Sequence, residues 1–250
     1  MIQAFYSATV GAQQQMQRMD VHANNISNVN TQGFKAQVPS FQALMYGMQE
    51  GIDGKQLPRG TGDVMALTGT NMDSGALVET DRDLDYAIVG DGFFALYDPG
   101  TGEVSFTRDG SFTIASLQTA ANTRDAGDPE EGPQEVYYLC DGEGRQVLGP
   151  DGYPIVMDDT TTQPSIGVFS IQYVDGLERA GSSRFLTGDK NGMVYNSNAS
   201  VRQGFLESSN ADLATELTGV IEAQRSYSYV LKMLTTADEV ETTINNLTNG

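Results

Sequence analysis

The chain begins with apolar positions spaced alternately three and four residues apart. These positions are Ile2, Phe5, Thr9, Ala12, Met16, Met19, Ala23 and Ile26. Only Thr9 is polar, and such spacing keeps side chains on one side of an α-helix, as in the seam of a coiled coil. The pattern predicts an N-terminal helix about 38 Å long with an apolar stripe along it.

A second stripe of the same kind lies at the C-terminal end. Its members are Leu213, Leu217, Val220, Gln224, Tyr227, Leu231 and Leu234. Beyond Leu234 the apolar positions continue after a step of three instead of four, which would locally overwind a coiled coil. Ser209 and Asp212 resemble a capping box, so we expect the helix to start there and run for about 36 residues, roughly 54 Å. A helix of that length needs a packing partner.

Between the stripes the pattern changes to short alternating runs rich in β-branched and aromatic residues. Gly, Asp or Pro turns such as Gly90-Asp91-Gly92 separate them, which is typical of antiparallel strands. The predicted strands are 86–89, 93–97, 105–107, 111–114, 136–139 and 166–173. The acidic stretch from Thr119 to Gln134, around Asp128, is predicted to be a surface loop.

The fold class expected from these patterns is α+β. Residues 1–34 with 205–250 would form a discontinuous helical core paired as a coiled coil, and 81–204 a β-rich outer domain. Residues 35–80 are predicted to be an extended Gly-rich connector, because Gly47 to Gly75 shows no regular period. The two stripes could bury themselves against each other or against neighbouring molecules, and the second arrangement would make a polymer.

Composition narrows the classes of protein. With 33 acidic and 14 basic residues the formal net charge is −19, which disfavours nucleic acid as a partner. No segment reaches the roughly 18 to 20 apolar residues of a membrane span. The first charged residue is Arg18, so the basic n-region of a secretory signal is missing, and we expect any export to proceed without a cleavable signal peptide.

The chain has one cysteine and one histidine, residue types that can act as nucleophile or base. Cys140 is the only cysteine, which excludes an intrachain disulfide, and its strand-like surroundings predict a packed, unreactive thiol. His22 is the only histidine, and a helix that ends in a polar loop offers no nucleophile turn. We expect His22 to be a solvated or hydrogen-bonded structural residue.

Carboxylates give no clear site either. Asp81, Asp83 and Asp85 alternate as in a calcium loop, but Tyr86 and Gly92 stand where that loop needs Gly and Glu. No phosphate-binding glycine motif opens a predicted helix. We therefore predict no catalytic residue, no cofactor and no metal.

Three stretches resemble the flagellar basal-body rod and hook protein family. The first is DVHANNISNVNTQGFK at 20–35. The second is DLDYAIVGDGFFAL at 83–96 with FTRDGSF at 106–112. The third is GFLESSN at 204–210 with EAQRSY at 222–227 and TAD at 236–238. The motif residues that this resemblance marks are Asn24, Asn25, Asn28, Gly33, Phe34, Ser209, Asn210, Gln224 and Arg225.

The resemblance implies a non-enzymatic axial protein of the bacterial flagellum. It implies a subunit exported by the flagellar type III apparatus and assembled helically with itself, next to other rod and hook proteins, as the shaft between motor and hook. The helices would pack in the inner tube and the β domain would face outward. Length and C-terminal residues favour the distal rod type over the proximal rod type, and both over the longer hook subunit.

Other functions remain open at this stage. One is a β-rich carbohydrate-binding or hydrolytic protein with helical arms, and another is a coiled-coil dimer with no flagellar role. For the rod interpretation, Thr9 and Gln224 could fix the register of the seam. Asn24, Asn25, Asn28 and Asn30 are predicted to shape the corner after the first helix and to touch the next subunit, with Gly33 at positive φ and Phe34 as an anchor.

Overall fold

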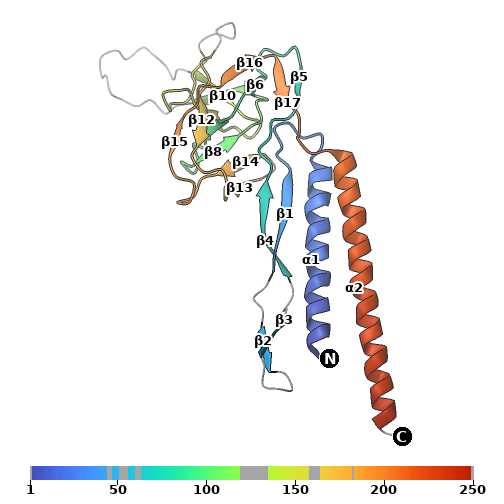
Figure 1. Ribbon diagram of the computed structural model, residues 1–250. Helices are drawn as coiled ribbons and strands as arrows, with labels where there is room; N and C mark the ends of the chain where they lie inside the picture. The colour runs from blue at the N-terminus through green and yellow to red at the C-terminus, as the bar shows by residue number, and fades with distance from the viewer. Residues whose placement is uncertain are drawn as a thin grey trace, which may run out of the picture. The chain divides into compact units, whose positions relative to one another are not determined.

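The structure is a computed structural model that describes residues 2–43, 47–50, 56–59, 63–118, 135–157, 164–181 and 183–248. Two long helices, α1 and α2, flank a series of antiparallel strands in the chain order (Figure 1). The predicted α+β class is confirmed.

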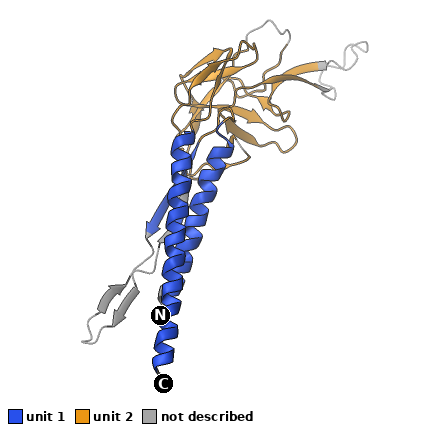
Figure 2. Cartoon of the chain, turned by 90° about the vertical axis from the view of Figure 1, so that its right-hand side faces the viewer, with its two compact units in different colours: residues 1–29, 36–71, 211–250 blue, residues 30–35, 72–210 orange. Residues whose placement is uncertain are grey.

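The chain forms two compact units, coloured separately in Figure 2. Unit 1 contains residues 1–29, 36–71 and 211–250, and unit 2 contains residues 30–35 and 72–210. Each unit therefore combines segments that are separated in the sequence.

The helices of unit 1 are α1 (Ile2–Ser27) and α2 (Leu213–Thr248), of 26 and 36 residues. They lie side by side and run in opposite directions (Figure 1). The cap of α2 is Asp212, whose Oδ2 accepts a hydrogen bond from the backbone N–H of Thr215 at 3.1 Å. The predicted capping box that starts at Ser209 is wrong, because Asp212 itself precedes the first helical residue.

Unit 1 also contains paired strands where the sequence predicted only an extended connector. Strand β1 (Gln37–Ala43) pairs with β4 (Asp63–Thr70), and β2 (Gly47–Glu50) pairs with β3 (Gln56–Arg59). The register of β1 shifts between Ser40 and Phe41. A bulge of this kind breaks the alternation of side chains, so a search for period two cannot find these strands.

Unit 2 is built on a nine-stranded sheet. Its order is β13-β14-β8-β7-β11-β10-β9, with β12 paired to β7 and β15 paired to β12. The bounds are β7 Phe93–Tyr97, β8 Val104–Thr107, β9 Thr113–Gln118, β10 Glu135–Cys140, β11 Gln146–Val147, β12 Val168–Ile171, β13 Glu178–Arg179, β14 Arg184–Leu186 and β15 Val194–Asn196. Two small sheets pair β5 (Leu77–Glu79) with β17 (Phe205–Glu207) and β6 (Tyr86–Val89) with β16 (Ser200–Gln203).

The core of unit 2 has two apolar clusters, one on each side of β7. Phe94 and Leu96 belong to one cluster, and Phe93 and Ala95 belong to the other. Successive residues of a strand point to opposite faces, so a strand buried on both faces is continuously apolar, as 93–97 is. All six predicted strands have a counterpart in unit 2, with ends shifted by up to a few residues.

Cys140 ends β10 and is fully buried, as predicted. Burial raises the pKa of its thiol, and the neighbouring charge of Asp141 adds to the shift. The loop predicted from Thr119 to Gln134 lies outside the described residues. Neither helix in the described part of the chain is long and apolar enough to cross a membrane.

Candidate functional site: the helix pair and the two buried carboxylates

Within the chain, no stripe residue with a described side chain is fully buried on α1 or α2. On α1, Phe5 and Met16 are about half exposed, at 49% and 50%. The exposed members on α2 are Leu213, Leu217, Gln224 and Leu231. Among the remaining stripe residues with described side chains, Ala23 is exposed. The others are partly buried, and they are Thr9, Ala12, Met19, Ile26, Val220, Tyr227 and Leu234. The side chain of Ile2 lies outside the described residues.

The faces that do pack are polar or small. On α1 the buried residues are Gln14, Val21 and Asn25, and on α2 they are Glu216, Gly219 and Ala223. At 3.6 residues per turn, the packed face of α2 is turned by about 80° from its predicted stripe, and that of α1 lies on roughly the opposite side. Part of the apolar stripe of each helix is therefore left on the surface.

Glycine allows the two helices to approach closely. A Cβ atom added at Gly219 would lie 2.5 Å from a ring carbon of His22. Further along, a Cβ at Gly11 would lie 4.0 Å from Cγ2 of Val230, an ordinary contact. A count of large apolar residues does not detect a contact made by residues this small.

On its packed face α1 also contacts the β1–β4 strand pair (Figure 1). The Oε1 atom of Gln14 accepts a hydrogen bond from the backbone N–H of Met65 in β4 at 2.6 Å. Near the end of α1, Nδ2 of Asn25 donates to the carbonyl of Gln37 at 2.8 Å, and the N–H of Gln37 donates to Oδ1 of Asn25 at 2.9 Å. Two buried amides thus attach the strand pair to α1.

Glu216 in the first turn of α2 joins this network. Its Oε1 accepts a hydrogen bond from Nδ2 of Asn25 at 2.9 Å, and its Oε2 lies 2.6 Å from Nδ1 of His22. His22 is therefore a hydrogen-bonded structural residue, as predicted. One carboxylate of the C-terminal segment is held by two side chains of the N-terminal segment.

The other asparagines of the motif lie at the end of α1. The backbone N–H and the Nδ2 of Asn28 both donate to the carbonyl of Asn24, at 3.2 and 2.9 Å. The side chains of Asn24 and Asn30 are exposed. Their contact with a second subunit stays a prediction.

In unit 2 the motif continues as Gly33, Phe34 and Lys35. Gly33 has a φ of 65°, and an added Cβ would lie 2.3 Å from the backbone nitrogen of Asp109, so only glycine fits. Phe34 is 1% exposed and carries the guanidinium of Arg179 over its ring at 5.2 Å. Gly33 and Phe34 thus have the predicted conformation and burial.

Lys35 ends in a buried cluster of three charges. Its Nζ donates to Oε1 of Glu207 at 2.6 Å, and Nη1 of Arg108 donates to Oε2 of the same carboxylate at 3.1 Å. Burial lowers the pKa of Lys35, while the hydrogen bond and charge of Glu207 oppose that shift. Glu207, like Glu216, is a buried carboxylate that binds a residue from the N-terminal segment.

The remaining motif residues follow Glu207 in the chain. Nδ2 of Asn210 donates to the carbonyl of Asp73 at 2.9 Å, and its backbone N–H donates to the carbonyl of Phe34 at 3.3 Å. Ser209 precedes it and is partly buried, whereas Arg225 is exposed on α2.

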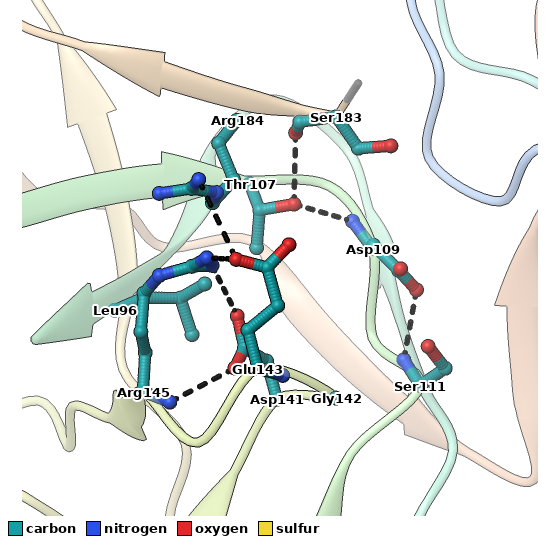
Figure 3. Close-up of a pocket in the computed structure, with 10 residues that line it drawn as sticks. All are labelled: Leu96, Thr107, Asp109, Ser111, Asp141, Gly142, Glu143, Arg145, Ser183 and Arg184. Carbon is teal, nitrogen blue, oxygen red and sulfur yellow. Dashed lines mark hydrogen bonds and ion pairs between the residues drawn. The ribbon is translucent and has the colours of Figure 1, made fainter. Parts of the chain in front are cut away.

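A polar pocket opens in unit 2 beside β8, β14 and the turn after β10 (Figure 3). Four of its charged side chains form ion pairs: Arg145 pairs with Asp141 at 2.7 Å, and both Arg145 and Arg184 pair with Glu143. The fifth, Asp109, accepts a hydrogen bond from the backbone N–H of Ser111 at 3.0 Å. We assign no ligand to the pocket. Among the described residues, no group of three His, Cys, Asp or Glu side chains could hold a metal ion.

Sequence reasoning missed the partners Arg108, Glu207 and Glu216. Glu216 is separated from His22 by 194 residues, and Glu207 from Lys35 by 172. An acidic residue in a helix first turn is ordinarily explained by the helix dipole, so Glu216 gave no other signal. Glu207 lies inside the quoted motif at 204–210, and that was the only hint of its role.

Comparison with known proteins identifies the class of this molecule. Residues 5–35 match the family described as "Flagella basal body rod protein", and residues 202–247 match "Flagellar basal body rod FlgEFG protein C-terminal". These two matched segments contribute His22, Asn25 and Lys35 on one side and Glu207 and Glu216 on the other. The two segments that match the family are therefore joined to each other by these side chains.

Relatives match over nearly the whole chain. The flagellar basal-body rod protein FlgG of Bacillus subtilis (strain 168) is 30% identical over 277 residues, covering 99% of each chain. FlgG of Borreliella burgdorferi is 31% identical over 274 residues, also 99% of each, and FlgF of Caulobacter vibrioides is 31% identical over 249 residues, 92% of this chain and 93% of that one. The chain belongs to the flagellar basal-body rod protein family, and it is a structural subunit of that rod.

Proposed function

We propose that this subunit assembles helically with copies of itself through the exposed stripes of α1 and α2. In the polymer these stripes pair as a coiled coil and form the inner part of a shaft that transmits torque from motor to hook. The subunit is of the distal rod type and contacts neighbouring rod and hook proteins at the ends of its own segment. It reaches the basal body through the flagellar type III export apparatus.

The observation that carries this proposal is the unused apolar surface of the helices. Exposed apolar residues along α2 include Leu213, Leu217, Ile221 and Leu231, which are 42–50% exposed in the single chain. A contiguous exposed apolar stripe marks an interaction site, because leaving it in water forgoes about 25 cal/mol for each Å² that burial would remove. A second copy of this chain offers the complementary stripe.

The polar members of the stripes fit a role in register. The hydroxyl of Thr9 donates to the carbonyl of Phe5 at 2.9 Å, and Gln224 is exposed. A polar residue in an otherwise apolar seam selects one alignment of the helices at a cost in stability. We assign this selection to Thr9 and Gln224.

The test replaces Leu217 and Leu231 together by Glu in a strain that lacks the chromosomal gene. Both side chains are exposed, so the free subunit should keep its helix content while assembly fails, because charges would enter the seam. The matched control, Thr218→Glu with Thr236→Glu, places the same two charges at exposed polar positions on another face of α2. Electron micrographs of basal bodies should show truncated rods for the double variant and complete rods for the control. Complete rods in both strains would overturn the proposal.

A further inference from the structure

Glu207 is the meeting point of three distant parts of the chain. Its two carboxylate oxygens bind Lys35, 172 residues earlier, and Arg108, 99 residues earlier. The same Oε1 also accepts a hydrogen bond from the backbone N–H of Gly75 at 2.8 Å. One side chain near the C-terminal boundary of unit 2 therefore joins three of its distant segments.

All three charged groups are out of contact with water. The exposed fractions of the side chains are 1% for Lys35, 1% for Glu207 and 3% for Arg108. Removing one partner of a buried ion pair is strongly destabilising because it leaves the other charge buried without compensation. Without Glu207, two cations would face each other in the same interior.

Neither cation can move to solvent without disturbing the core. The guanidinium of Arg108 lies 5.5 Å above the ring of Phe93, a member of the second apolar cluster, and its Nη2 donates to the carbonyl of Gly90 at 2.9 Å. Lys35 is held at its other end, because Nη2 of Arg179 donates to its carbonyl. Both cations are therefore held in fixed positions, and Glu207 supplies the carboxylate that compensates their charge.

We propose that Glu207 is a folding lock: unit 2 reaches its native state only after residue 207 has joined Lys35 and Arg108. Unit 2 stays unfolded until the segments that carry Lys35 and Glu207 have come together. The biological meaning rests on the proposed function, since a subunit passing through an export apparatus benefits from not folding early. The physical requirement does not depend on it.

The simplest competing explanation is that Glu207 acts only as a hydrogen-bond acceptor and space filler. A glutamine would then serve nearly as well, because it has the same shape and keeps one acceptor oxygen. The lock instead requires the negative charge. Removing all three charges together should abolish the requirement, because apolar replacements of similar volume leave no charge uncompensated.

The test uses three variants of the full-length protein: Glu207→Gln, the triple variant Lys35→Met/Arg108→Met/Glu207→Met, and Glu79→Gln. Glu79 is exposed on β5, the strand paired with β17, and controls for loss of a carboxylate in the same small sheet. The readout is labelling of the buried Cys140 thiol across a urea gradient, which reports the opening of unit 2.

The lock predicts that Glu207→Gln lowers the urea midpoint of labelling by about 1–2 M, from the cost of an uncompensated buried charge and typical urea slopes. The triple variant should recover most of that loss, and Glu79→Gln should match the wild type. If Glu207→Gln yields no folded protein, a folded triple variant still supports the lock. Equal midpoints for Glu207→Gln and Glu79→Gln, or a triple variant no more stable than Glu207→Gln, would overturn it. The purified subunit is used, so failure here is separate from failure of the assembly test.

Discussion

The side-chain amide of Asn25 and the backbone of Gln37 exchange two hydrogen bonds across 12 residues of chain, at 2.8 and 2.9 Å. Two residues that exchange both bonds form the unit of pairing in an antiparallel sheet. Asn25 therefore acts as a strand partner for the first residue of β1 while it remains part of α1. An ionised Asp supplies only acceptors and Ala supplies neither group, so neither residue could replace Asn25 in this pairing.

Replacing Asn25 by Ala should destabilise unit 1 strongly. The change leaves the N–H and carbonyl of Gln37 and one oxygen of Glu216 without their partner in a site where Asn25 is fully buried. We expect a loss of about 2–4 kcal/mol in the free energy of unfolding, measured by circular dichroism at 222 nm in urea. Asn24→Ala, an exposed position in the same motif, should change it by less than about 0.5 kcal/mol. Equal losses in the two variants would refute the role given to Asn25.

Two glycines on the helices should respond to alanine in opposite directions. In a helix interior Gly→Ala is worth up to about 1 kcal/mol in propensity, and Gly11→Ala should show that gain because its Cβ meets only an ordinary contact. Gly219→Ala should lose about 1–3 kcal/mol, because its Cβ would overlap the His22 ring and push the helices apart. Helix unfolding of both proteins, followed by circular dichroism, checks the difference.

Removal of the His22 ring should relieve the clash that Gly219→Ala creates. Replacing His22 by Ala removes the ring, so Gly219→Ala should cost less in a His22→Ala background than in the wild type. A double-mutant cycle measures this coupling. Strict additivity of the two changes would mean that the ring and the glycine do not meet.

Gly33→Ala should destabilise unit 2 by more than its backbone strain alone. Gly33 and Gly102 both have positive φ, at 65° and 75°, but nothing lies within 4 Å of a Cβ at Gly102. Gly102→Ala should therefore cost about 1 kcal/mol from conformation, and Gly33→Ala clearly more, because its Cβ enters the backbone of Asp109. The labelling of Cys140 in urea measures both, and similar midpoints would contradict the close approach.

Gln224→Leu tests the register role proposed for a polar stripe position. Gln224 is exposed on α2 of the single chain, so the helix should keep its stability. Removing the polar residue should permit alternative alignments of the seam and disturb assembly order. Swimming in soft agar and electron microscopy of basal bodies are the measurements, and normal rods with normal swimming would reject the role.

Both helices and six of the strands could be predicted from the sequence. Steps of three and four marked both helices, and the continuous apolar run at 93–97 marked the central strand of unit 2. Strands β1 and β4 could not be found this way, because a bulge and polar residues on both faces remove the period. The strands β13 to β17 have two to four residues each, which is too few to show an alternating period.

The same method located the stripes but not the faces that pack. Periodicity weighs large apolar residues, whereas the contact between α1 and α2 uses Gly219, Ala223 and buried amides or carboxylates. The pairings of Glu216 with His22 and of Glu207 with Lys35 span most of the chain, and one sequence holds no signal for them. The stripes that the sequence marked are the surfaces that we propose for assembly.

If the exposed stripe of the helices becomes buried when subunits assemble, as we propose, the exposure of Met16 should show it most directly. Met16 lies on the stripe of α1 and is 50% exposed in the single chain. Its oxidation by peroxide can be followed by mass spectrometry in free subunits and in isolated rods. We predict that Met16 is oxidised readily in the free subunit and is protected in the rod. Equal rates of oxidation in both forms would contradict the claim.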